Sequence, residues 1–149
     1  MNKKIHYSNR RAKRDYFIVK KIEAGVVLTG SEVKAIKTQG INLDQALIQL
    51  KDNELYLVNA FIPAYKFATD RPYDPRAKRK LLLKKNQIKT LIAAKQKKLA
   101  IVPLSCYNKN GWIKILVGVG RRKKKFEKKQ AIIERTLKRK LKEEENRWG

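Results

Sequence analysis

The order of hydrophobic and polar positions predicts a chain built mainly from short β-strands. Runs rich in Val, Ile, Leu and aromatic residues, loosely alternating with polar ones, are typical of strands that bury one face. The expected strands are Tyr16–Leu28 (interrupted near Gly25), Ala46–Leu50, Leu55–Phe61, Leu81–Leu83, Leu99–Tyr107 and Trp112–Val119. Most of the chain between residues 15 and 120 should therefore belong to one β-rich body.

Two short helices and two tight turns are expected between these strands. A first helix over Glu32–Thr38 would begin at Ser31 as N-cap and end at Gly40, and a second covers Asn86–Lys98. Hairpin turns are expected at residues 51–54 and at Asn110-Gly111, the strongest turn signal in the chain. Residues 63–80 hold three prolines and should form a long loop.

These elements favour a mainly β fold. Many short strands, two short helices and a basic exterior suggest an oligonucleotide-binding-like β-barrel, closed or nearly closed, with short flanking helices. The alternation of strands and helices also permits a small α+β sandwich, and the pattern alone does not choose between the two.

Charge changes this picture at both ends of the chain. Residues 1–14 form a basic arm, residues 15–120 the barrel domain, and residues 121–149 a tail with 13 Lys and Arg against 5 Glu. Phe126, Ile133, Leu137 and Leu141 fall on one narrow helical stripe. The tail is either loose when free and helical against a polyanion, or a solvated basic segment that only improves solubility.

The overall charge of +25 points to nucleic acid as the partner, ahead of anionic membrane. No run approaches the roughly 20 apolar residues of a membrane-spanning helix, and no signal peptide opens the chain. One Cys and one His leave no zinc site and no nucleophilic triad. We therefore expect a cytoplasmic binding protein without metal or cofactor, and not an enzyme.

Several segments together resemble the SsrA-binding proteins, the tmRNA-binding small protein B family. The strongest is Glu23-Ala24-Gly25-Val26-Val27-Leu28-Thr29-Gly30-Ser31-Glu32-Val33-Lys34, preceded by Asn9-Arg10-Arg11-Ala12 and Asp15-Tyr16. Further matches are Asn42-Leu43, Leu57-Val58-Asn59, Asp74-Pro75-Arg76, Arg79-Lys80-Leu81-Leu82-Leu83, Val102-Pro103-Leu104, Tyr107, Lys109-Asn110-Gly111, Lys123-Lys124, Lys128 and Arg135. No single motif carries the resemblance, which covers nearly the whole chain.

The resemblance implies a function in ribosome rescue. Proteins of this family bind the tRNA-like domain of tmRNA through the barrel and deliver it to stalled ribosomes for trans-translation. Their tail, disordered in solution, turns helical in the empty mRNA channel near the small-subunit decoding region. The implied partners are thus tmRNA and the ribosome, with no DNA and no membrane, and the RNA-bound protein is expected to be a monomer.

The same resemblance implies two sets of contact residues. The tmRNA face would include Asn9, Arg14, Glu23, Lys34, Lys80, Leu83 and Lys114. The ribosome-binding tail would include Lys123, Lys124, Phe126, Glu127, Lys128, Lys129 and Arg135.

The sequence departs from the family pattern at a few of these positions. Arg14 stands where the family has His, Arg122 replaces a Gly, and Phe126 holds the place of Tyr or His. Arg keeps a cation and a stacking plane but cannot accept a hydrogen bond. The competing interpretations are a general RNA-binding or ribosomal protein whose tail threads rRNA permanently, and, less favoured, an RNA-modifying enzyme.

Overall fold

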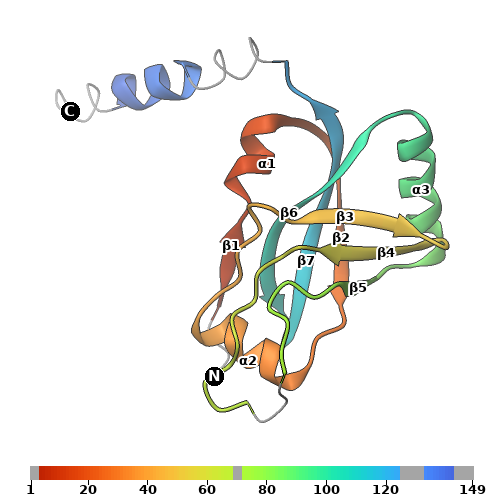
Figure 1. The fold of residues 1–149 in the computed structure, drawn as a ribbon. Helices are drawn as coiled ribbons and strands as arrows, with labels where there is room; N and C mark the ends of the chain where they lie inside the picture. Colours follow the sequence, from red (N-terminus) through yellow and green to blue (C-terminus); the bar gives the residue numbers. More distant parts are fainter. Residues whose placement is uncertain (1–3, 69–71, 125–132, 143–149) are drawn as a thin grey trace.

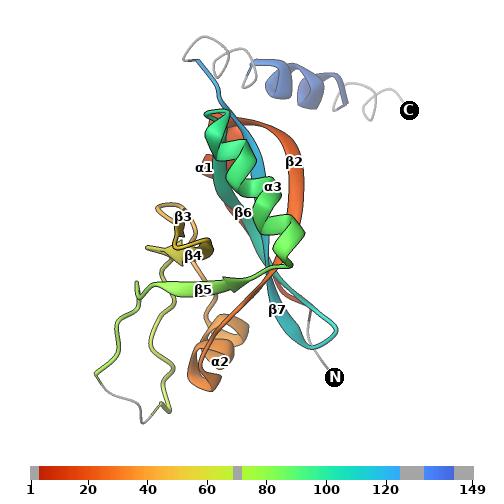
Figure 2. The same cartoon turned by 90° about the vertical axis from the view of Figure 1, so that its right-hand side faces the viewer.

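A computed structural model describes residues 4–68, 72–124 and 133–142 of the chain. Its named elements are β1 (His6–Ser8), α1 (Arg10–Asp15), β2 (Tyr16–Val26), α2 (Gly30–Thr38), β3 (Leu47–Lys51), β4 (Glu54–Val58), β5 (Arg79–Leu82), α3 (Lys85–Gln96), β6 (Ala100–Lys109) and β7 (Trp112–Arg122). Figures 1 and 2 show the three helices at the margins of the strands. Residues 133–142 are also helical.

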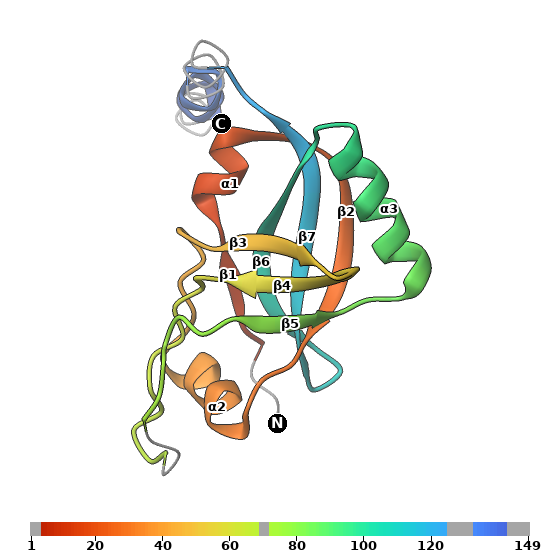
Figure 3. The same cartoon turned by 45° about the vertical axis from the view of Figure 1, so that its right-hand side comes forward.

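The seven strands form one antiparallel sheet in the order β1-β6-β7-β2-β5-β4-β3. The long strands β2, β6 and β7 run roughly upright in Figure 3, and the shorter β3, β4 and β5 cross in front of them. The sheet is therefore curled around a single interior. No ladder joins β1 to β3 in the described part of the chain, so the strands make an oligonucleotide-binding-like barrel that stays open between its two edge strands. The predicted mainly β fold is confirmed.

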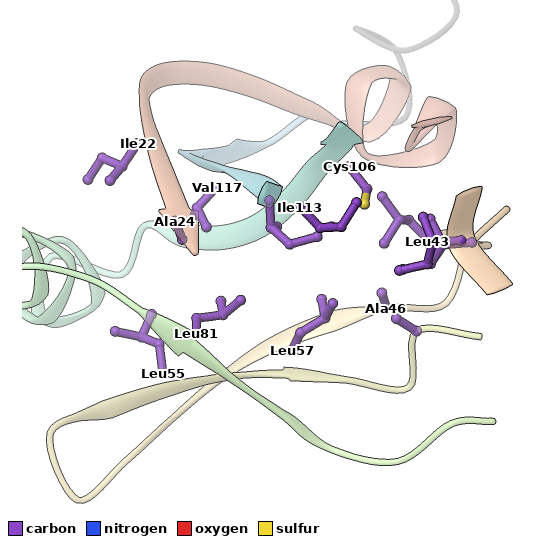
Figure 4. Close-up of a cluster of buried hydrophobic side chains, with 14 of the residues drawn as sticks. Ile22, Ala24, Leu43, Ala46, Leu55, Leu57, Leu81, Cys106, Ile113 and Val117 are labelled. Atoms are coloured by element: carbon purple, nitrogen blue, oxygen red, sulfur yellow. The ribbon is translucent and has the colours of Figure 1, made fainter. Parts of the chain in front are cut away.

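The interior is filled by side chains from both halves of the curled sheet. Figure 4 shows Leu55, Leu57 and Leu81 on one side, opposite Ala24 and Val117 on the other. All five are at most 3% exposed. Their alternation with polar residues along each strand is the pattern from which the strands were predicted, because successive side chains of a strand point to opposite faces. This core fixes which residues face outward.

Two hairpins have the turns that the sequence predicts. Asp52 and Asn53 connect β3 to β4, and Asn110 and Gly111 connect β6 to β7, all with positive φ between 52° and 81°. Two consecutive positive φ values define the type I′ turn, whose twist matches that of the flanking strands. Asn, Asp and Gly are the residues that tolerate this conformation.

Helix α2 begins two residues earlier than expected. Its N-cap is Thr29, not Ser31. The Thr29 hydroxyl accepts a hydrogen bond from the Glu32 N–H at 3.1 Å, and the Glu32 carboxylate accepts one from the Thr29 N–H at 3.0 Å. This reciprocal capping box satisfies two backbone donors, which a cap at Ser31 would not. The helix ends before Gly40, whose φ of +96° explains the stop.

Strand β2 is not interrupted near Gly25 as predicted. It continues to Val26, and Gly25 pairs with Leu82 of β5 on one side and Lys114 of β7 on the other. A Cβ at position 25 would lie 3.3 Å from the Cβ of Leu82. The glycine therefore allows β5 to approach closely, and it does not break the strand.

The folded body extends beyond the composition boundaries at residues 15 and 121. Strand β1 pairs with β6 although it lies inside the basic arm. Strand β7 continues through Arg121 and Arg122, which pair with Phe17 and Tyr16 of β2. These boundaries therefore mark changes in charge, and part of each charged end belongs to the sheet.

Candidate nucleic-acid interface

Strand β7 separates an apolar inner face from a polar outer face. Ile113, Ile115 and Val117 point into the core and are at most 7% exposed. Trp112 and Lys114 alternate with them and point outward, and Trp112 is 72% exposed. The same alternation on β2, β6 and β5 makes one continuous outward surface, which we call the outer sheet face. Its members used below are Glu23, Lys80, Leu82, Tyr107, Lys109, Trp112 and Lys114.

Glu23 of β2 lies on the outer sheet face and has two partners from β6. The Tyr107 hydroxyl donates a hydrogen bond to its carboxylate at 2.5 Å, and the Lys109 ammonium lies 3.5 Å from the same oxygen. The hydrogen bond from Tyr107, opposed by some desolvation and helped by Lys109 and Lys114, lowers the pKa of Glu23. Burial, and then this bond, raise the pKa of Tyr107. Glu23 is thus held ionised, with acceptor capacity left for a ligand's N–H or O–H groups.

Cross-strand register brings Lys114 into the same group. Gly25 is the partner of Lys114 in β7 and of Leu82 in β5, and Tyr107 is the partner of Lys114 in β6. Directly opposed residues on adjacent strands have Cβ atoms about 4.5–5.5 Å apart. A row across four strands therefore runs from Tyr107 through Lys114 and Gly25 to Leu82, which is 53% exposed.

Lys80 continues this surface towards β4. Its ammonium lies 2.9 Å from Glu54, and this pair is nearly half exposed on both sides. The Tyr56 hydroxyl donates to Glu54 at 2.9 Å, and the Lys78 ammonium lies 4.1 Å from the centre of the Tyr56 ring. Cations interleaved with aromatic rings suit RNA, because phosphates supply affinity and unstacked bases rest on rings.

A buried ion pair holds the long loop before β5 against α2. Arg79 and Glu32 are 3% and 6% exposed, with Nη2 of Arg79 2.7 Å from Oε2 of Glu32. The guanidinium also donates to the carbonyl oxygens of Ala60, at 2.8 Å, and Pro75, at 3.0 Å. Tyr73 donates to the Ile62 carbonyl at 2.9 Å and receives a bond from Arg79. This network positions the strand from which Lys80 and Leu82 project.

The structure brings some of the expected tmRNA-face residues together and separates others. Glu23, Lys80 and Lys114 share the outer sheet face, whereas Lys34 is exposed on α2 with its ammonium 5.7 Å from the Tyr65 ring. Leu83 is half-buried and packs against the core. The exposed leucine at this point of the face is Leu82, because β5 alternates and position 83 falls on the inner side.

Asn9 caps the N-terminus of α1 and Arg14 lies on that helix, apart from this group of strands. Asn9 is 3% exposed, accepts from the Ala12 N–H at 3.1 Å and donates to the Pro103 carbonyl at 2.8 Å. Its side chain is therefore occupied as a helix cap and cannot offer a free amide to a ligand. Arg14 is about half exposed and bonds Asp15 at 3.2 Å.

The expected tail contacts lie partly outside the described residues. Phe126, Glu127, Lys128 and Lys129 belong to that part, and the structure gives no information on them. Lys123 is only 9% exposed, whereas Lys124 and Arg135 are exposed. In the helix over residues 133–142, Ile133, Leu137 and Leu141 are each more than half exposed.

Three residues of the outer sheet face were not identified from the sequence. The sequence places Tyr107 and Trp112 in expected strands but gives them no role in a site, and the contact of Lys109 with Glu23 spans 86 positions. Side chains alternate between the two faces of a strand. Because Ile113 and Ile115 are apolar and face the core, Trp112 and Lys114 could have been predicted to face outward together. No comparable signal in the sequence links Tyr107 to Glu23.

Comparison with known proteins places this geometry in a family. The family model described as "SmpB protein" matches residues 6–147. The chain belongs to the SmpB family. Among curated SmpB relatives, the SsrA-binding protein of Sulfurihydrogenibium sp. (strain YO3AOP1) is 42% identical over 142 residues, covering 95% of this chain and 93% of that protein. That of Shouchella clausii is 40% identical over 139 residues, covering 93% and 89%.

A solved SmpB structure shares the fold. It is described as "tmRNA-SmpB: a journey to the center of the bacterial ribosome", is 39% identical, and superposes with a TM-score of 0.66. The match covers 80% of this chain and 85% of that one. Within the residues that our structure describes, no cluster of metal-ligating side chains occurs and no helix is long and apolar enough to cross a membrane.

Proposed function

We propose that this protein binds the tRNA-like domain of tmRNA and delivers it to stalled ribosomes for trans-translation. The carrying observation is the match to SsrA-binding proteins along nearly the whole length of both chains. A match of this extent leaves little room for a different domain organisation. The name of those relatives says that they bind SsrA RNA. That this protein binds the same RNA is part of the proposal.

The outer sheet face is the proposed tmRNA surface. Lys80, Lys109 and Lys114 supply positive charge for phosphates, and Trp112 offers an exposed ring to an unstacked base. Glu23 supplies an acceptor for amino groups or 2′-hydroxyls, which a purely cationic surface lacks. A carboxylate among cations also penalises arbitrary polyanions, so it adds discrimination between RNAs at some cost in affinity.

The basic tail is proposed to enter the empty mRNA channel near the decoding region of the small subunit. The channel is a polyanionic tube when it holds no message, and a cationic segment can replace the missing message there. The exposed apolar stripe of residues 133–142 would then be covered by contacts made inside the channel. Ordering of the tail would itself report that the channel is vacant.

The protein is proposed to act by binding alone, in the cytoplasm, as a monomer on its RNA. The groups singled out above are donors, acceptors, rings and cations, which are suited to recognition. The charge of +25 is that of a protein whose partner is a polyanion.

Binding measured on matched RNAs tests the proposal. A structured tRNA-like RNA should bind more tightly than duplex DNA or unstructured RNA of equal length, with an affinity that falls steeply as salt rises. Lys114→Met should reduce the slope of log affinity against log salt by about one if Lys114 contacts a phosphate. Lys95→Met, an exposed lysine on α3, is the matched control and should leave binding unchanged. Equal affinity for every polyanion would overturn the proposal.

The remaining alternative is a structural ribosomal protein with a permanently threaded tail. The two functions differ in stoichiometry. A rescue factor should be substoichiometric to ribosomes when they are purified from cells, whereas a structural protein should be equimolar. Sequencing of the RNA that copurifies with the protein should give tmRNA in the first case and rRNA alone in the second.

A further inference from the structure

Where β7 leaves the sheet, two cations share one aromatic ring. The guanidinium carbon of Arg121 lies 4.5 Å from the centre of the Phe17 ring, and the ammonium of Lys123 lies 4.8 Å from it. Arg121 pairs directly with Phe17 across the β2–β7 ladder. Alternate residues of an extended chain point to the same side, so Lys123 reaches the ring from two positions further along.

The backbone at this point is fixed as well. The Lys123 N–H donates to the Asp15 carbonyl at 2.8 Å, one residue beyond the last ladder pair. A Cβ at position 120 would lie 1.9 Å from the Phe17 carbonyl oxygen, so only glycine permits this approach of β7 to β2. The approach occurs beside the irregularity between Ile18 and Lys20, where the register of the ladder shifts.

Burial sets Lys123 apart from its neighbours. It is 9% exposed, whereas Arg121, Arg122 and Lys124 are exposed. Lysines are seldom buried unless their charge is paired, and the described residues place no carboxylate within 4 Å of its ammonium. Among the described residues, the negative face of the Phe17 ring lies 4.8 Å from this ammonium and offsets part of its charge.

We propose that Phe17 is a positioning residue that fixes the direction in which the tail leaves the body. Lys123 then belongs to the body and does not contact the ribosome, and the tail begins at Lys124. This inference rests on the proposed function only for its consequence, that the tail must reach the mRNA channel while the outer sheet face holds tmRNA. Fixing the departure direction reduces the entropy that ordering the tail would otherwise cost.

We call the contact of Phe17 with Arg121 and Lys123 the clamp. It is tested first in the free protein, without RNA or ribosomes. Amide hydrogen exchange of Lys123, followed by NMR, reports its bond to Asp15. Phe17→Leu keeps apolar volume but has no π-face, and it should accelerate this exchange roughly fivefold to tenfold. Phe17→Tyr keeps the ring and should restore the wild-type rate. Phe67→Leu removes another ring with a cation nearby, at an exposed loop position, and serves as the control.

The consequence is tested by peptide tagging on stalled ribosomes. Phe17→Leu should lower the tagging rate about fivefold to tenfold while tmRNA affinity stays within about twofold, and Phe17→Tyr should tag normally. Unchanged Lys123 exchange in Phe17→Leu overturns the clamp, and so does a Phe17→Tyr variant as impaired as Phe17→Leu, which would indicate packing alone. If the wild-type protein fails to tag, the proposed function is wrong, and the exchange rates still decide the clamp.

Discussion

At the scale of single residues, the most informative group is Glu23, an acid among the lysines of the outer sheet face. The pKa of Glu23 lies below its usual value because Tyr107 donates a hydrogen bond to the carboxylate and Lys109 lies beside it. An ionised carboxylate at this position weakens the attraction of the outer sheet face for phosphates. We infer that its value lies in selecting which RNA groups can approach, since only donors satisfy its remaining lone pairs.

Removing the Tyr107 hydroxyl tests this arrangement. Tyr107→Phe should raise the pKa of Glu23 towards 4.5, because its largest stabilising partner is lost. A lowered folded-state pKa adds stability that is present above about pH 4.5 and is lost as the pH falls through the folded-state value. The variant should therefore lose less stability on acidification than the wild type. NMR titration of the carboxyl carbons measures the pKa, and an unchanged Glu23 titration would contradict the assignment. Tyr56→Phe is the matched control, since its hydroxyl bonds Glu54.

At the scale of elements, turns and caps differ in how far the sequence predicts them. The two type I′ turns were predicted because Asp-Asn and Asn-Gly pairs act through local backbone geometry. The α2 cap was misplaced by two residues, since Thr29 and Ser31 are both good caps and only the reciprocal bond with Glu32 selects Thr29. Local rules indicate that a helix begins, but several residues can compete for the cap.

The site was predictable only in part for a related reason. The resemblance named Glu23, Lys80 and Lys114, and the structure groups them on one face. It also named Leu83 and Asn9, but Leu83 packs against the core and the Asn9 side chain caps α1. The Glu32–Arg79 pair joins residues 47 positions apart, and no periodic pattern in the sequence announces it.

The Glu32–Arg79 pair predicts a large loss of stability. Arg79→Leu leaves a buried carboxylate without its partner, which costs about 3–5 kcal/mol of unfolding free energy. Urea denaturation measures this loss. Lys80→Leu, the next residue, breaks a nearly half-exposed pair with Glu54 and should cost much less. Similar losses for both variants would show that burial does not distinguish the two pairs.

Phe126, the first of the two aromatic residues in the tail, lies outside the described residues and carries a prediction of its own. If Phe126 stacks on an rRNA base, Phe126→Ala should weaken tagging roughly tenfold to a hundredfold, because base stacking is worth about 1–3 kcal/mol. Phe126→Tyr should change it little. Phe126→Leu separates stacking from packing, since leucine keeps apolar volume without a π-face. Full tagging by Phe126→Leu, with normal tmRNA affinity, would rule out stacking.

At the scale of the whole molecule, the body and tail should be separable functions, with the cut placed by the structure. A chain ending after Lys124 keeps the ladder partners of Tyr16 and Phe17 and the Lys123–Asp15 bond. It should retain most tmRNA binding and lose rescue. A chain ending after Gly120 loses those contacts and should also be less stable to heat. Loss of tmRNA binding in the chain that ends after Lys124 would show that the tail is part of the RNA-binding surface.

The order of the strands has a consequence for biosynthesis. β2 and the short β1 are made first, yet β1 pairs with β6 and β2 pairs with β7, the last strand to be translated. Strands that pair across a long stretch of sequence fold slowly, because the chain loses the entropy of loop closure before the stabilising contacts form. A polypeptide released before residue 112 would lack β7, the strand that joins β6 to β2. Translation products that end before β7 should therefore be targets for degradation, with no residual RNA binding.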